Sequence, residues 1–115
     1  MESKLIRHCF SCDLKDEPEI IETYKKHHKP GNVWPEITDS IKAAGIVNMQ
    51  IYLSGNRLFM IMEVDDSYDP LKKAEQDAAN PKVQEWETLM WVFQQALPWA
   101  KTGEKWVKME GIFNL

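Results

Sequence analysis

The segment from Val47 to Val64 most constrains what this chain can fold into. Two runs with strand alternation, 47–53 and 57–64, flank the pair Gly55-Asn56, which is typical of a tight β-hairpin turn. In the second run, apolar residues occupy both alternating faces until Glu63. A strand that is apolar on both faces usually lies inside a sheet rather than at its edge. The sequence therefore predicts an antiparallel sheet with 57–64 as a central strand.

The other periodic segments flank this hairpin in the chain. Strand alternation covers residues 4–13 and 104–113. Helical spacing covers residues 18–28, 35–45, 71–79 and 81–97. We expect Asn80 to cap the last and longest of these helices and Pro98 to end it.

The resulting order, β-α-β-β-α-β, is that of a ferredoxin-like α+β sandwich. In this fold the helices cover one face of a four-stranded antiparallel sheet. The other face would be exposed, although it carries large side chains. We therefore expect a homodimer in which two sheets face each other.

The composition is that of a globular protein. With 115 residues, 43% hydrophobic and 28% charged, the chain fits one domain over residues 1–115. The net charge of −4 argues against nucleic acid or an acidic membrane as the main partner. We expect a cytoplasmic protein, because the N-terminus is charged and no apolar run has the length of a membrane span.

Cys9 and Cys12 form a CxxC spacing, which occurs in redox and zinc sites. A redox pair needs a helix N-terminus, where the thiol pKa is lowered. Here the pair falls in the first predicted strand, where residues three apart point to opposite faces. We interpret both cysteines as structural and reduced.

The candidate site is the segment from Tyr24 to Glu36, which concentrates proton-handling side chains. Tyr24 and His28 are four residues apart, so they share one face of the predicted helix. Together they can form a general acid/base pair or bind a sugar hydroxyl. The alternative is that Tyr24 closes the core while His28 caps the helix end. His27 should face elsewhere and be solvated.

Two tryptophans, Trp34 and Trp86, are candidates for stacking on a sugar, or else they fill the core. Glu36 and Glu87 are acid/base partners or solvated helix carboxylates. The chain has no phosphate loop, nucleophile elbow or metal-ligand cluster. A cofactor-free proton transfer or plain binding remains. We assign three further tryptophans to the core: Trp91, Trp99 and Trp106.

These motifs, in this order, resemble the L-rhamnose mutarotase family over nearly the whole chain. The matching motifs are Tyr24-x-x-x-His28, Trp34-Pro35-Glu36, Asn48-x-x-Ile51-Tyr52-Leu53, Leu58-Phe59, Trp86 and the closing Ile112-Phe113-x-Leu115.

The resemblance implies a dimeric α/β barrel that interconverts the α and β anomers of a 6-deoxy-sugar without a cofactor. It implies that His28 is the proton donor and that Tyr24 and Trp86 bind the sugar. Two sugar-contact positions depart from the rhamnose-type pattern, which has tyrosine at Met49 and tryptophan at Glu87. The closing segment is more similar to a subgroup linked to L-fucose.

Other functions occur on the same fold. They include cofactor-free monooxygenases, haem-binding proteins and non-catalytic sugar-binding dimers, and fold alone does not separate them.

Overall fold

The computed structural model describes residues 4–115, and residues 1–3 of the predicted domain lie outside this range. The strands are β1 (Ile6–Leu14), β2 (Ile46–Ser54), β3 (Arg57–Val64), β4 (Gln94–Gln95) and β5 (Val107–Lys108). The helices are α1 (Pro18–His27), α2 (Pro35–Ala43), α3 (Pro70–Ala78) and α4 (Pro81–Phe93).

Each of these helices begins with a proline in its first turn. Proline fits there because the first backbone N–H groups of a helix have no intrahelical partner. Asp69 caps α3 by accepting a hydrogen bond from the Leu71 N–H at 3.0 Å. Asn80 caps α4 by accepting one from the Lys82 N–H at 3.1 Å, as predicted.

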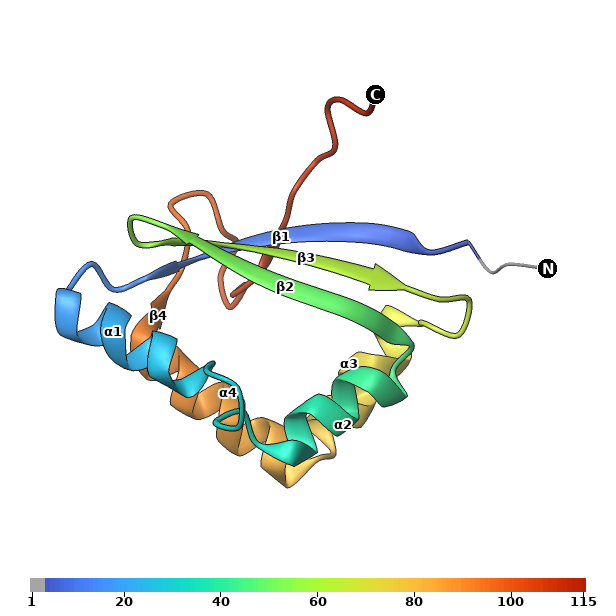
Figure 1. The fold of residues 1–115 in the computed structure, drawn as a ribbon, viewed down its shortest axis with the longest axis horizontal. Helices are drawn as coiled ribbons and strands as arrows, with labels where there is room; N and C mark the ends of the chain where they lie inside the picture. The colour runs from blue at the N-terminus through green and yellow to red at the C-terminus, as the bar shows by residue number, and fades with distance from the viewer. Residues whose placement is uncertain (1–3) are drawn as a thin grey trace.

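The sheet is antiparallel, with the order β2-β3-β1-β4 and β5 paired to β1. β3 is central, as its two apolar faces predicted, and Gly55 in the β2–β3 turn has a φ of +60°. Helices α1 to α4 all lie on one side of this sheet (Figure 1). The ferredoxin-like α+β prediction is confirmed.

The core lies between the sheet and the helices. On the sheet side, Leu14 and Leu58 are buried, and both strands turn alternate side chains toward the helices. The helices complete this core with the buried side chains Tyr24, Ile37, Val83, Trp86, Met90 and Phe93.

The two cysteines are free thiols on opposite faces of β1, where Cys9 pairs with Ile61 and Cys12 with Leu58. Cys12 is fully buried, and burial raises the pKa of its thiol to about 12. A thiol with so high a pKa forms little thiolate at neutral pH, which fits a structural role.

The prediction that the last helix runs to Leu97 is wrong. α4 ends at Phe93, and Gln94 takes an extended backbone conformation that pairs with Leu14 in β1. The Phe93 carbonyl then accepts a hydrogen bond from the Lys15 N–H at 2.9 Å. Leu97 is buried in this non-helical segment too, so its place in an apolar stripe does not prove a helix.

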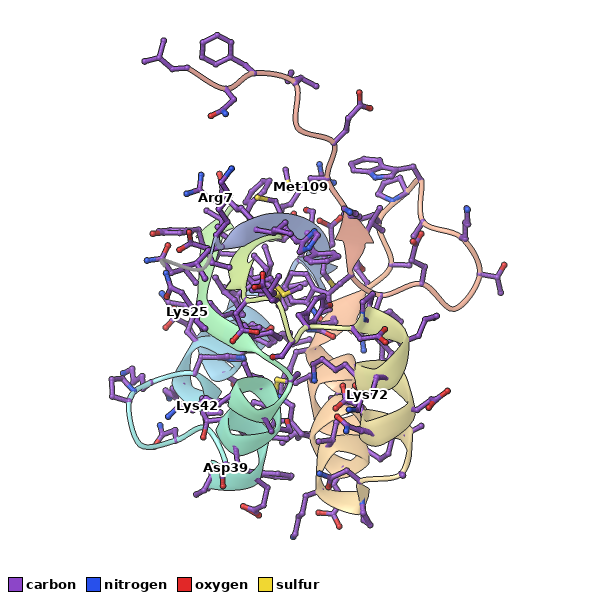
Figure 2. All side chains as sticks on the ribbon, turned by 90° about the vertical axis from the view of Figure 1, so that its right-hand side faces the viewer. Arg7, Lys25, Asp39, Lys42, Lys72 and Met109 are labelled. Carbon is purple, nitrogen blue, oxygen red and sulfur yellow. The ribbon has the colours of Figure 1, made fainter. Side chains whose placement is uncertain are left out.

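The last predicted strand, 104–113, is also wrong in extent, since only Val107–Lys108 pairs with β1. The Met109 N–H still bonds the Cys9 carbonyl at 2.8 Å, and the chain then leaves the body of the molecule (Figure 2). We call residues 110–115 the tail. Its side chains Ile112, Phe113 and Leu115 are almost fully exposed. Alternation marks an extended segment but does not supply a partner strand.

No helix within residues 4–115 has the length and apolar character needed to cross a bilayer.

Candidate active site

A cavity of about 990 Å³ lies between the helix-facing side of the sheet and the helices. It is within the ~300–1,000 Å³ range of small-molecule pockets. Apolar side chains from β2, β3 and the helices surround a few polar groups. Five side chains singled out in the sequence line this cavity: Tyr24, His28, Met49, Trp86 and Glu87.

His28 and Tyr24 are in contact at the end of α1, with ring centroids 4.3 Å apart. The His28 Nδ1 atom lies 2.8 Å from the Tyr24 backbone carbonyl. A carbonyl can only accept, so Nδ1 carries the hydrogen and Nε2 keeps its lone pair. His28 is also the C-cap residue of α1, so the capping role and the place in the cavity occur together.

Burial lowers the pKa of His28 below its usual value, and the neighbouring His27 lowers it further. The hydrogen bond to the Tyr24 carbonyl raises the pKa, but less than burial lowers it. His28 is therefore neutral at pH 7. In this form its Nε2 atom is ready to accept a proton.

Tyr24 is buried, with 4% of its surface exposed, and it packs against Phe93 at a centroid distance of 6.3 Å. Its hydroxyl accepts a hydrogen bond from the Gln94 Nε2 group at 3.2 Å. Burial raises the pKa of Tyr24 to about 12, although the Gln94 hydrogen bond partly lowers it. The hydroxyl therefore stays protonated and can donate.

Trp86 forms one wall of the cavity beside His28, with centroids 5.8 Å apart and the rings edge to face. Trp34 contacts the Trp86 ring at 5.1 Å but is not among the residues that line the cavity. Trp34 therefore contacts Trp86 without itself lining the cavity.

His27 is partly buried, with its ring 5.4 Å from that of Phe93. The prediction of a solvated His27 is wrong. Adjacent helix positions differ by about 100°, and the face that carries His27 packs against α4.

Met49 and Glu87 lie on different walls of the cavity, because Met49 belongs to β2 and Glu87 to α4. Glu36 is exposed in the first turn of α2 and does not line the cavity. Glu87 is exposed as well, so the two carboxylates differ in that only Glu87 lines the cavity. Within residues 4–115, no three His, Cys, Asp or Glu side chains lie close enough to hold a metal ion.

Sequence reasoning missed many of the residues that line the cavity, among them Gln94, Lys105 and Trp106. The available signal for Gln94 was a polar residue directly after the apolar Phe93. Lys105 and Trp106 follow α4 in a loop that only the tertiary structure returns to the cavity. Trp91 and Trp99 are exposed, so their assignment to the core is wrong.

Comparisons with known proteins identify the family of this chain. Residues 7–115 match the family model described as L-rhamnose mutarotase. The chain is 47% identical over 109 residues to an L-fucose mutarotase of Xanthomonas campestris pv. campestris, covering 95% of this chain and 87% of that protein. It is 38% identical over 107 residues to a UPF0734 protein of Dictyostelium discoideum, covering 90% and 84% of the two chains.

A crystal structure of an L-rhamnose mutarotase from Formosa agariphila superposes with a TM-score of 0.69. The alignment covers 96% of this chain and 98% of that one, at 24% identity, and it supports the fold alone. The family assignment rests on the model match over residues 7–115 and on the 47% identity to the Xanthomonas protein. On these grounds, the chain belongs to the L-rhamnose mutarotase family.

Proposed function

We propose that this protein interconverts the α and β anomers of a 6-deoxyhexose and that L-fucose is its preferred sugar. The observation that carries the proposal is the neutral His28 ring in the cavity. Its Nδ1 atom is held by the Tyr24 carbonyl and its Nε2 atom is left to exchange protons. The mutarotase family names support this class of reaction.

Ring opening breaks the bond from C1 to the ring oxygen and forms a C1=O1 double bond. One proton leaves the anomeric hydroxyl and one reaches the ring oxygen, so nothing is consumed. His28 Nε2 accepts the proton from the anomeric hydroxyl, and the resulting imidazolium acts as an acid in the reverse step. Closure from the opposite face of the carbonyl gives the other anomer. No cofactor is needed for these steps.

Tyr24 and Trp86 hold the sugar in this proposal. The buried Tyr24 hydroxyl donates to a sugar hydroxyl, and the Trp86 ring packs on a C–H face of the sugar. Trp34 acts by supporting the Trp86 ring from behind. Its predicted direct contact with the sugar stays a prediction.

Glu87 is the better of the two carboxylates for the second proton transfer. Its side chain lines the cavity, whereas that of Glu36 lies outside the lining. In this proposal a protonated Glu87 carboxyl gives its proton to the ring oxygen, directly or through one water molecule, as His28 Nε2 takes the proton of the anomeric hydroxyl, and ring closure returns both protons.

The preference for L-fucose rests on two observations. The relative at 47% identity is named an L-fucose mutarotase. In addition, Met49 and Glu87 line the cavity at positions where the rhamnose-type pattern has aromatic residues. L-fucose and L-rhamnose differ in the configuration of their ring hydroxyls, so changed side chains at these positions favour a changed sugar.

We further propose that two copies associate through the sheet faces that the helices leave uncovered. This face carries Tyr52, Phe59 and Ile61 beside polar residues, and Tyr52 is more than half exposed. The tail, which leaves the body of the molecule, carries further exposed apolar side chains. Burying them against a second copy removes apolar area from water.

Saturation-transfer NMR on L-fucose and L-rhamnose tests the proposed activity. We expect the protein to accelerate anomer exchange, more strongly for L-fucose. If the anomers of both sugars exchange only at the spontaneous rate, the protein is not a mutarotase for these sugars and the proposal is wrong. Binding by calorimetry without acceleration would identify a sugar-binding protein, and a Soret band after incubation with haem would identify a haem protein.

A further inference from the structure

Gln94 has no role in the proposed proton transfer, yet it is one of the most buried polar residues in the described chain, with 5% of its surface exposed. It follows the last residue of α4 and pairs through its backbone with Leu14 in β1. This pairing ends the helix and fixes where the side chain begins. The side chain lines the cavity and reaches the Tyr24 hydroxyl.

The hydrogen bond between these side chains has a direction. The Gln94 Nε2 group donates and the Tyr24 oxygen accepts, at 3.2 Å. Among residues 4–115, Gln94 is the side chain that hydrogen-bonds this hydroxyl. A phenol has one proton, which this bond leaves unused. The proton can then be given to an acceptor in the cavity.

The surroundings of Tyr24 limit where that acceptor can be. The His28 ring and the Phe93 ring pack against the tyrosine, and within residues 4–115 the Tyr24 hydroxyl accepts from Gln94 and donates no hydrogen bond. The His28 Nδ1 hydrogen is used by the Tyr24 backbone carbonyl. A ligand hydroxyl in the cavity, which Tyr24 lines, can accept the phenol proton.

We propose that Gln94 is a positioning residue, whose donated hydrogen bond holds the Tyr24 hydroxyl so that its proton points to a sugar hydroxyl. The inference rests on the proposed mutarotase function and deepens it. Gln94 acts through Tyr24, and Tyr24 contacts the sugar. An apolar side chain at 94 would let the phenol proton rotate, and a carboxylate would accept that proton itself.

The variants Gln94→Met and Tyr24→Phe, alone and combined, test this coupling. Methionine keeps the length and shape of the side chain while removing its amide. We expect Gln94→Met to raise the KM for L-fucose about fivefold with kcat within about twofold, as for loss of one neutral hydrogen bond to bound substrate. In the Tyr24→Phe background, the same change should have no further effect, because the hydroxyl is gone.

Gln95 provides the matched control, since it is the exposed neighbour in the same two-residue strand. Gln95→Met should leave both constants unchanged. Urea unfolding of each variant separates a loss of stability from a loss of positioning. Gln94→Glu is the second variant: we expect it to weaken binding at pH 8 at least as much as Gln94→Met does.

The outcomes separate this inference from the proposed function. If the wild type accelerates exchange of neither sugar, the proposed function fails and this inference fails with it. If the wild type is active but Gln94→Met keeps its KM, or lowers activity equally in the Tyr24→Phe background, Gln94 is structural only. Full affinity of Gln94→Glu at pH 8 would show that residue 94 does not need to donate.

Discussion

At the scale of a single residue, His28 both ends a helix and lines the cavity. It ends α1, and its ring lies in the cavity with Nδ1 donated to the Tyr24 carbonyl 2.8 Å away. The capping contact selects the tautomer, because a carbonyl accepts only from a nitrogen that carries hydrogen. The contact that stabilises the helix end therefore also leaves Nε2 with the lone pair that the proposed proton exchange needs.

His27 provides a matched control for His28, because it is adjacent, partly buried and outside the cavity lining. We expect His28→Ala to lower kcat/KM for anomer exchange by about 10²–10⁴-fold, the usual contribution of a general acid or base. His27→Ala should stay within about threefold of the wild type. Saturation-transfer NMR measures both, and equal losses would contradict the assignment.

The activity should depend on pH through His28. Because burial lowers the pKa of His28 below the usual ~6.5, we expect the rate to be constant near neutrality and to fall as the pH drops through that lowered value. Tyr24, with a pKa of about 12, does not limit the rate near neutrality. Exchange rates from pH 4.5 to 9, corrected for the spontaneous reaction, check this. An activity that rises toward low pH would contradict it.

Like the activity, the free energy of unfolding should decrease as the pH falls, because of His28. The unfolded chain binds a proton at His28 near pH ~6.5, whereas the folded chain binds it only at lower pH. The contribution of His28 to the free energy of unfolding is therefore complete above ~6.5. It is lost as the pH falls toward the folded pKa.

Met49 and Glu87 should determine the choice of sugar. We expect the double variant Met49→Tyr, Glu87→Trp to shift the ratio of kcat/KM values toward L-rhamnose by about 10-fold or more, since single contacts of this kind discriminate by ~10–200-fold. Competition NMR with both sugars measures the ratio. The pair Lys82→Ala, Glu85→Ala on the exposed surface of α4 is the control, and an equal shift there would count against the assignment.

At the scale of secondary-structure elements, the starts of the helices follow from sequence better than their ends. Proline in the first turn and side-chain caps at Asp69 and Asn80 act within a few residues of the start. The end of α4 depends instead on β1, which pairs with Gln94 from far away in the chain. No local signal reports that pairing.

The junction between α2 and β2 depends on Gly45, whose φ is +89°. A Cβ atom there would also approach the Ser67 hydroxyl and come within 2.6 Å of the Asp65 carboxylate. We expect Gly45→Ala to lower the free energy of unfolding by about 2–4 kcal/mol, from backbone strain and steric overlap together. Urea unfolding measures the change.

Gly103 is the control for this prediction, because its φ of +81° is similar and its Cβ would meet nothing within 4 Å. We expect Gly103→Ala to cost only the backbone term, about 1 kcal/mol. Equal losses at the two glycines would mean that the space around Gly45 is not limiting.

At the scale of the whole molecule, one face of the sheet is covered by helices and the other is not (Figure 1). We expect sedimentation at micromolar concentration to give twice the 13.4 kDa chain mass. The double variant Ile112→Ser, Phe113→Ser should weaken self-association at least tenfold, because both side chains are exposed in the tail. Leu71→Ser, at an exposed leucine on α3, is the control, and a monomeric wild type would contradict the prediction.

The sequence by itself determined the order of the elements, the central place of β3 and the shared face of Tyr24 and His28. All three are set by short-range periodicity, turn residues and the burial of apolar faces. Only the tertiary structure decided the end of α4, the short pairing of β5 and the contact between Gln94 and Tyr24, which are 70 positions apart. It also decided that Glu87 lines the cavity and that Glu36 does not. These features depend on which distant segments meet, and local patterns carry no information on that.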